Sequence, residues 1–293
     1  MKHPLLQNSQ GSHPDVILDD MFPEGIVDMA FAAEARTLLL ATKAGTLTLL
    51  RQDGTLLESN RSLPGVHRVV WAENGCFGAA IAGNDKVVCL YPNLTPAWDV
   101  TVTGCVRSIA ITPYGSHLAI CGESGVTHIV TTDREQISRF ETIRPLDFVQ
   151  FLSERQRLIG AAEFGHLCCH DLSGEEIWNE RITNNVGGMF VTGDGKRILL
   201  ASYNQGVQMM NGRGQQKGSF LLDGVPTVVR ASYNRQRIVA LTQESRIYLL
   251  NFDGEMQWAA DLSNDPPVNI CLGPFGDRLF VCTASGRLLQ LQW

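Results

Sequence analysis

Residues 108–130 read SIAITPYGSHLAICGESGVTHIV, and six further segments of the chain repeat this pattern. The seven copies begin at residues 28, 68, 108, 148, 188, 228 and 269, so the step is 40 residues until one residue is inserted near Asp265-Pro266-Pro267. A fixed period of this length is the signature of a repeat architecture. Together the copies account for nearly all of the chain after residue 24.

Each copy divides into three short apolar segments separated by turns. In the copy quoted above these segments are residues 106–112, 117–122 and 126–131, and they lack the 3.6-residue period of a helix. Apolar segments of this length, bounded by Gly, Asn and Asp, are typical of β-strands. A fourth, more polar segment follows turns such as Asp53-Gly54 and Ser173-Gly174, whose residues suit tight hairpins. Four strands in a repeat of about forty residues predict one blade of a β-propeller.

The repeats therefore predict an all-β fold, a single seven-bladed β-propeller with four-stranded blades in which residues 1–293 form one domain. The blades are expected to start near residues 25, 65, 105, 145, 185, 225 and 266. The seventh copy supplies only three strands before Trp293. We expect residues 14–20, which follow an N-terminal tail at 1–13, to add the missing strand, because a closed propeller leaves no sheet edge open to pairing with another chain.

Two sets of turn and rim residues recur in characteristic positions. They are Val106, Ser108, Pro113-Tyr114-Gly115 and Ser124-Gly125 in the third copy, and Gly174-Glu175-Glu176-Ile177-Trp178 and Gly254-Glu255-Met256-Gln257-Trp258 at two rims. The first set resembles the WD40-like repeat, and the second resembles the rim strand of PQQ-like blades. In the PQQ-like family this tryptophan packs between blades, so the resemblance implies structural roles for Trp98, Trp178 and Trp258. A resemblance of this kind implies architecture and leaves the function open.

Composition and charge narrow the class of partner. The formal net charge is −6, and charged residues make up 18% of the chain. A broad nucleic-acid surface needs clustered Lys and Arg, so the sequence argues against nucleic acid and favours a protein partner. No secretory signal or membrane-spanning segment is visible, and the eight cysteines lack the paired spacing of a disulfide framework. We therefore expect a cytoplasmic protein with reduced cysteines and no membrane partner.

One cluster has the residue types of a metal site. His166, Cys168 and His170 alternate along one predicted strand, and Cys168 is followed by Cys169. Residues two apart on a strand lie roughly 6.5 to 7 Å from each other, so the three side chains cannot easily share one ion, and consecutive cysteines face opposite sides. We therefore expect no metal and no redox pair here. Because the chain also lacks a nucleophile elbow and a phosphate-binding loop, we expect no cofactor and assign no catalytic residue.

The remaining candidates lie on the loops that enter each innermost strand and on the second hairpin of each blade. These loops vary in chemistry while the strands around them repeat, which is the pattern of a binding surface on a rigid scaffold. Phe164 and Tyr203 are the predicted anchors, because aromatic residues are enriched at interaction hot spots. The predicted partner-binding residues are His67, Lys86, Arg107, Asp147, Phe164, Tyr203, Asn204 and Arg246.

The function expected from the sequence is a non-catalytic interaction scaffold or sensor module within a larger assembly. Two alternatives place a site at the mouth of the central channel. One is a propeller enzyme, a hydrolase or lyase built around His67, Arg107 and Asp147; the other is a small-ligand binder. Perturbed titratable groups in a deep pocket favour the enzyme, whereas a broad shallow patch favours the scaffold.

Overall fold

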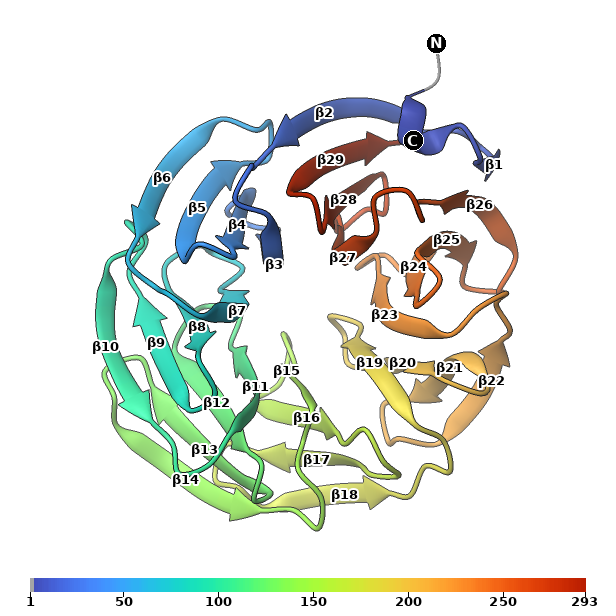
Figure 1. Cartoon of the computed structure of the whole chain (residues 1–293). Helices are drawn as coiled ribbons and strands as arrows, with labels where there is room; N and C mark the ends of the chain where they lie inside the picture. Colours follow the sequence, from blue (N-terminus) through green and yellow to red (C-terminus); the bar gives the residue numbers. More distant parts are fainter. Residues whose placement is uncertain (1–2) are drawn as a thin grey trace. The chain divides into compact units, whose positions relative to one another are not determined.

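The fold is described from a computed structural model, in which residues 3–293 form seven antiparallel sheets (Figure 1). Six of these sheets have four strands, and one gains a short fifth strand from the N-terminal segment. The sheets are the blades of the all-β, seven-bladed propeller that the repeats predict. The chain divides into two compact units, which are described separately: unit 1 contains residues 1–26 and 183–293, and unit 2 contains residues 27–182.

Unit 2 carries the first four blades, and in each of them the strands neighbour one another in sequence order. The strands of the first two blades are β3 (Ile26–Ala32), β4 (Thr37–Thr42), β5 (Thr46–Arg51), β6 (Leu56–Arg61), β7 (Val66–Trp71), β8 (Gly78–Ala82), β9 (Lys86–Leu90) and β10 (Pro96–Thr101). Those of the next two are β11 (Val106–Ile111), β12 (His117–Gly122), β13 (Val126–Thr131), β14 (Gln136–Glu141), β15 (Phe148–Phe151), β16 (Arg157–Ala161), β17 (Leu167–Asp171) and β18 (Glu176–Glu180).

Unit 1 carries the last three blades and the N-terminal segment. The fifth and sixth blades contain β19 (Val186–Val191), β20 (Arg197–Ser202), β21 (Gly206–Asn211), β22 (Gln216–Phe220), β23 (Pro226–Ala231), β24 (Arg237–Thr242), β25 (Arg246–Asn251) and β26 (Met256–Asp261). The seventh contains β27 (Pro267–Leu272), β28 (Arg278–Thr283) and β29 (Arg287–Gln292), joined by β2 (Asp15–Met21). The N-terminal segment also forms a short 3-10 helix, η1 (Pro4–Leu6), and β1 (Gln10–Gly11).

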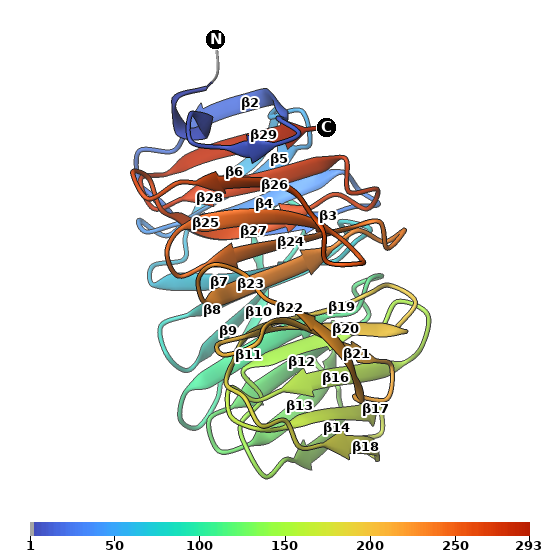
Figure 2. The ribbon, with the colours of Figure 1, turned by 90° about the vertical axis from the view of Figure 1, so that its right-hand side faces the viewer.

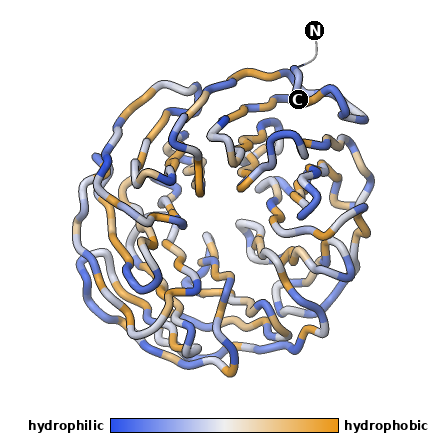
Figure 3. Tube along the Cα trace, in the orientation of Figure 1, coloured by the Kyte–Doolittle hydropathy of each residue, from blue (hydrophilic) through white to orange (hydrophobic). Residues whose placement is uncertain are grey.

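Burial decreases from the inner strands to the rim strands, as the sequence predicts. Every residue of β12 after the first is buried, whereas β6 is exposed along nearly its whole length. The inner strands of each blade are covered on both faces by neighbouring blades. Successive residues of these strands are therefore apolar, even though their side chains point to opposite faces. The apolar clusters of each unit accordingly join neighbouring blades, as where Ile81 of β8 packs with Ile120 of β12. Figure 3 shows apolar segments recurring along the strands.

The tight turns before the rim strands have the backbone that their sequence predicts. Gly54 and Gly174 have φ angles of 88° and 86°. These values lie in the left-handed region, which glycine enters without the steric cost that a Cβ imposes. The hairpins into β6 and β18 therefore depend on glycine at these positions.

The seventh blade is completed by the N-terminal strand. β2 pairs antiparallel with β29 from Asp15 opposite Gln292 to Met21 opposite Arg287, and the two strands run side by side in Figure 1 and Figure 2. Val16, half-buried, packs against the apolar cluster of the sixth and seventh blades. The predicted closing strand at 14–20 is therefore confirmed, with both its first and its last residue one position later.

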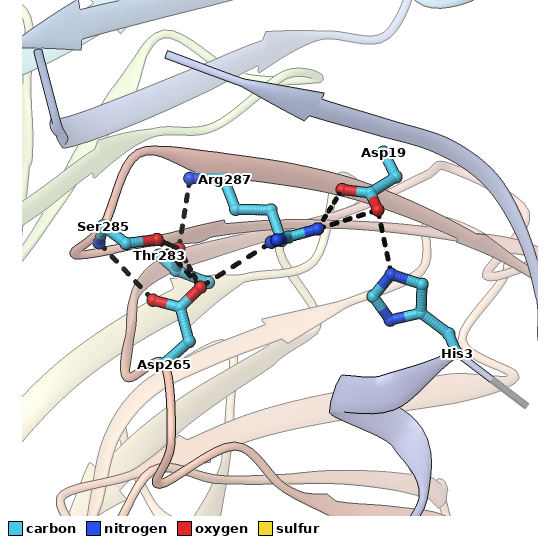
Figure 4. A network of polar contacts seen from close by, with 6 residues as sticks. All are labelled: His3, Asp19, Asp265, Thr283, Ser285 and Arg287. Atoms are coloured by element: carbon cyan, nitrogen blue, oxygen red, sulfur yellow. Dashed lines mark hydrogen bonds and ion pairs between the residues drawn. The ribbon is translucent and has the colours of Figure 1, made fainter. Parts of the chain in front are cut away.

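A polar network fastens β2 to the seventh blade (Figure 4). Arg287 donates from Nη1 to both carboxylate oxygens of Asp19, at 2.7 and 2.8 Å, and His3 lies 2.9 Å from the same carboxylate. Asp265 lies on the other side of Arg287, with Oδ2 3.8 Å from Nε. Partial burial alone raises the pKa of Asp19, but the hydrogen bonds and charges of His3 and Arg287 outweigh it and hold that pKa below its usual value.

The described residues before β2, predicted only as part of a tail at 1–13, contact the sixth blade. Gln10 and Gly11 of β1 pair with Ala259 and Trp258 of β26, and Leu6 of η1 is buried in the apolar cluster around Trp258. Gly11 has a φ of 85°, and a Cβ at this position would lie 2.2 Å from the carbonyl oxygen of Gln257. Glycine is thus required where the N-terminal segment meets β26.

Candidate interaction site

The two ends of a blade can be defined from its register. The first residue of an innermost strand pairs with the last residue of the second strand, as Val106 does with Gly122. The loop entering the innermost strand and the hairpin between the second and third strands therefore lie at one end, here called the loop end. The turns between the first and second strands and between the third and fourth strands lie at the other, here called the first-hairpin end.

Asp147 is the centre of the loop-end site in unit 2. Its Oδ1 accepts hydrogen bonds from Nε and Nη2 of Arg107, at 2.8 and 2.5 Å, and its Oδ2 accepts one from the backbone N–H of Glu163, at 2.7 Å. The side chain of Asp147 is 14% exposed, so the pair is partly shielded from solvent. The hydrogen bond and charge of Asp147 raise the pKa of Arg107. One carboxylate thus joins the third blade to a hairpin of the fourth.

The hairpin held by Asp147 carries Phe164. This ring follows Glu163 directly and is 48% exposed. Gly165, with a φ of 69°, turns the chain after it, and the N–H of Ile182 donates to the Gly165 carbonyl at 3.3 Å. The hairpin is therefore fixed on both sides of Phe164, which presents a large apolar side chain to solvent at low conformational cost.

Cys105 and Glu123 adjoin this site and extend it. The N–H of Glu123 donates to the Cys105 carbonyl at 2.8 Å, and a Cβ on Gly104 would lie 2.4 Å from Oε1 of Glu123. A hydrogen bond to Glu123 raises the pKa of Cys105, while the charge of Arg107 opposes that shift. Glu123 lies on a second hairpin, one of the loops predicted to bind a partner. Cys105 carries no sequence signal that sets it apart from the other cysteines.

His67 and Lys86 are placed at the same end without joining the cluster. His67 is exposed, and its Nδ1 lies 3.5 Å from the Gly65 carbonyl oxygen. Lys86 forms an ion pair with Asp99 of the neighbouring strand at 3.0 Å. Within residues 3–293, neither side chain hydrogen-bonds to Arg107 or Asp147. An exposed pair such as Lys86 and Asp99 adds little to stability.

The predicted site residues of unit 1 are more constrained than the sequence suggests. The ring of Tyr203 is half-buried and lies over Gly187, since a Cβ there would be 2.9 Å from its Cε1. Arg246 pairs with Asp223 and lies 3.8 Å from Asp261. Asn204 is exposed. Tyr203 therefore offers less free ring surface to a partner than Phe164, because part of its ring already packs against its own blade, and both stay predicted anchors.

Sequence reasoning missed the exposed aromatic residues at the first-hairpin end. These are Tyr91 and Tyr114 in unit 2, and Tyr233 and Phe275 in unit 1. Two of them occupy the same motif, since Pro113-Tyr114-Gly115 and Pro274-Phe275-Gly276 are equivalent turns. Aligning the repeats could have shown that both rings occupy the same turn position, but it could not have shown which rings are exposed.

The His166, Cys168 and His170 cluster is buried and packed. The ring of His170 stacks on Phe140 with centroids 4.0 Å apart, and Cys168 donates to the Gly160 carbonyl at 3.6 Å. Burial lowers the pKa values of both histidines. Across the described part of the chain, no three His, Cys, Asp or Glu side chains are placed to share a metal ion.

Thiol reactivity can be predicted from this placement. Cys76 is exposed, Cys105 is half-buried, and the other six cysteines are buried. Burial raises the pKa of Cys121 and of Cys169 to about 11, which suppresses the reactive thiolate. In the native protein we expect a polar aromatic disulfide to modify Cys76 quickly and Cys105 more slowly. The Cys105 rate should keep rising with pH above the ordinary thiol pKa, because Glu123 raises the pKa of this thiol.

The Cys76→Ser variant is the control for this measurement. It should remove the fast phase and leave the slower, pH-dependent phase unchanged. Rapid modification of several thiols in the native protein is the opposite result, and it would show that the blades open far more readily than their burial indicates.

The sequence matches no protein-family model, and no curated protein is significantly similar to it. Among the described residues, no helix has the length and apolar character required to cross a membrane.

Proposed function

We propose that this propeller is a non-catalytic interaction scaffold that binds a protein partner at the loop end of unit 2. The observation that carries the proposal is the clamp on Asp147, which fixes a hairpin with an exposed Phe164 at its tip. A pre-positioned aromatic beside an arginine has the composition of an interaction hot spot. Because the hairpin is already ordered, a partner binding there loses little affinity to ordering the site.

The state of Asp147 favours binding over catalysis. Both of its carboxylate oxygens already accept hydrogen bonds, from Arg107 and from the Glu163 backbone. A general base must have an oxygen directed at the proton it removes. These contacts therefore suit Asp147 to a positioning role better than to the role of general base in a hydrolase or lyase. A propeller enzyme of that kind and a small-ligand binder remain the alternatives.

Other features of the molecule support the repeat type and the location that we propose. The PQQ-like repeat type is supported by Trp98, whose Nε1 donates to the Thr132 carbonyl of the next blade at 2.6 Å. A cytoplasmic location suits the exposed thiol of Cys76, which a reducing compartment would preserve. Asn204 and Arg246 of unit 1 stay predicted contacts, as do His67 and Lys86.

The test is partner capture by the immobilised full chain from a lysate of its source cells, quantified by mass spectrometry. Phe164→Ala and Arg107→Glu should each reduce the recovery of the same partner by about thirtyfold, which corresponds to roughly 2 kcal/mol for a hot-spot residue. The melting temperature of Phe164→Ala should stay near that of the wild type, because this side chain is exposed. Arg107→Glu also loses its hydrogen bonds to Asp147 and should melt lower, so its capture is measured at a temperature where it is fully folded.

Matched controls lie at the first-hairpin end of the same unit. Glu34→Ala and Glu154→Ala alter exposed residues there and should leave capture unchanged. If these controls abolish capture while the Phe164 variant retains it, the binding surface has been assigned to the wrong end. A hydrolytic activity of the wild type that disappears in Asp147→Ala would favour the enzyme instead.

A further inference from the structure

The first-hairpin end of unit 1 presents two exposed aromatic rings on adjacent turns. Tyr233 is 57% exposed and Phe275 is 70% exposed. They belong to the turns at 232–237 and 273–278, which precede β24 and β28. Large apolar side chains grouped at a surface are characteristic of interaction sites. These residues are separate from the loop-end site of unit 2.

Hydrogen bonds and packing hold both rings in place. The N–H of Tyr233 donates to the Pro274 carbonyl at 2.7 Å, and the side-chain amide of Asn234 donates to the Phe275 carbonyl at 3.4 Å. On the other side the Tyr233 ring lies over Gly193, where a Cβ would be only 2.0 Å from it. Tyr233 thus links three successive turns, and the surface is ordered before any partner arrives.

The turns between the first and second strands, which carry these rings, are cationic, opposite in sign to the chain as a whole. The turns at 192–197, 232–237 and 273–278 contain five basic residues against two acidic ones, in a chain of net charge −6. The basic residues are Lys196, Arg197, Arg235, Arg237 and Arg278.

Both acidic residues of these turns are paired within the surface. Asp194 lies 3.4 Å from Arg235 and 3.7 Å from Lys196, and Asp277 lies 3.7 Å from Arg278. The three remaining positive charges are uncompensated within these turns, although Arg197 and Arg237 are half-buried and Arg237 donates to the Gly276 carbonyl at 2.8 Å.

The repeat does not by itself produce this charge. The equivalent turns of unit 2 balance Arg36, Arg155 and Arg157 against Glu34, Glu73 and Glu154. Tyr114 stands in a turn of the same Pro-aromatic-Gly form as Phe275, yet its own turn at 113–117 carries no Lys, Arg, Asp or Glu. The combination of exposed rings with an excess of arginine is thus particular to unit 1.

We propose that the first-hairpin end of unit 1 is a docking surface for an acidic protein segment whose apolar side chains pack on Tyr233 and Phe275. Arginines beside the rings attract carboxylates and steer the encounter, while the rings supply the desolvated contacts that hold the segment. A nucleic acid fits less well, because phosphate backbones need a dense array of Lys and Arg and the chain is acidic overall. This inference concerns a second surface, and it stands whether or not the loop-end site binds.

The test selects peptide ligands directly, so the identity of the natural partner need not be known. A phage library of random short peptides is panned on the immobilised full chain, and the affinity of the most enriched peptide is then measured by fluorescence polarisation. We expect peptides that combine Asp or Glu with Leu, Ile, Phe or Trp, bound more weakly as salt is raised. Phe275→Ala and Arg278→Glu should each weaken binding by at least about tenfold.

Two controls separate this surface from others. Tyr114→Ala removes the ring at the equivalent turn of unit 2, and Phe164→Ala removes the anchor of the loop-end site; both should bind the peptide like the wild type. Three results would overturn the proposal: no enrichment over the bare support, enriched peptides without acidic residues, or equal binding by Phe275→Ala. Tighter binding of a labelled oligothymidine that is lost in the same two variants would assign the surface to single-stranded nucleic acid.

Discussion

A chain that lacks residues 1–21 is expected to melt at least about 10 °C below the full-length protein and to aggregate when warmed. The deletion removes six paired positions between β2 and β29. A net contribution of about 1 kcal/mol for each hydrogen bond lost, at roughly 2 to 4 °C per kcal/mol, gives a decrease of this size. It also leaves β29 as an open sheet edge, which can pair with another chain.

The same deletion should expose Trp258. In the described part of the N-terminal segment, Leu6 packs in the same apolar cluster as this ring, and Gly11 pairs with Trp258 in the sheet. We therefore expect the tryptophan emission of the truncated chain to shift to longer wavelength at temperatures where it is still folded. Differential scanning fluorimetry measures the melting temperature and this shift together.

A synthetic peptide of residues 10–24 provides the control. It should restore the melting temperature of the truncated chain, whereas the same peptide with Val16 and Leu18 changed to Asp should not, because both side chains are half-buried in β2. If the truncated chain melts like the full-length protein, the seventh blade does not depend on β2, and the pairing described here is not what stabilises it.

The repeat period explains why the strands were predictable. Residues 106–112, 117–122 and 126–131 were expected as strands, and β11, β12 and β13 end within one residue of those bounds. Seven copies place each turn glycine and each apolar segment several times over, so local ambiguities are resolved by comparison within the chain. The fold was therefore contained in the sequence to a degree that a single-copy domain does not allow.

The N-terminal segment and the site were less predictable, for different physical reasons. Residues 3–13 have no copy elsewhere in the chain, so nothing indicated that Gln10 and Gly11 would pair with β26. In the site, Phe164 and Tyr203 looked equivalent because they occupy neighbouring positions of the same hairpin type. Their exposure differs because Gly187 leaves space beneath Tyr203, a contact that depends on tertiary packing.

Trp258→Ala is expected to destabilise unit 1 by about 3 to 5 kcal/mol, the range for deleting a fully buried large aromatic. The ring is 0% exposed and packs edge-on against Trp293, with centroids 5.3 Å apart. Trp178 is the matched control, because it occupies the equivalent position of the fourth blade, 80 residues earlier, and is only half-buried. Trp178→Ala should cost clearly less, since less apolar surface returns to water.

A conservative variant separates packing from hydrogen bonding. Within residues 3–293, Nε1 of Trp258 has no acceptor, so Trp258→Phe removes a buried polar group along with part of the ring. Removing this unpaired N–H recovers the free-energy cost of burying it, which offsets part of the cost of the lost packing. Trp258→Phe should therefore be much more stable than Trp258→Ala. Thermal and urea unfolding of the three variants measure these differences. Of these two tryptophans, only Trp258 packs against the described part of the N-terminal segment. Equal losses of unfolding free energy for Trp258→Ala and Trp178→Ala would therefore show that the N-terminal segment does not stabilise the packing of the sixth blade.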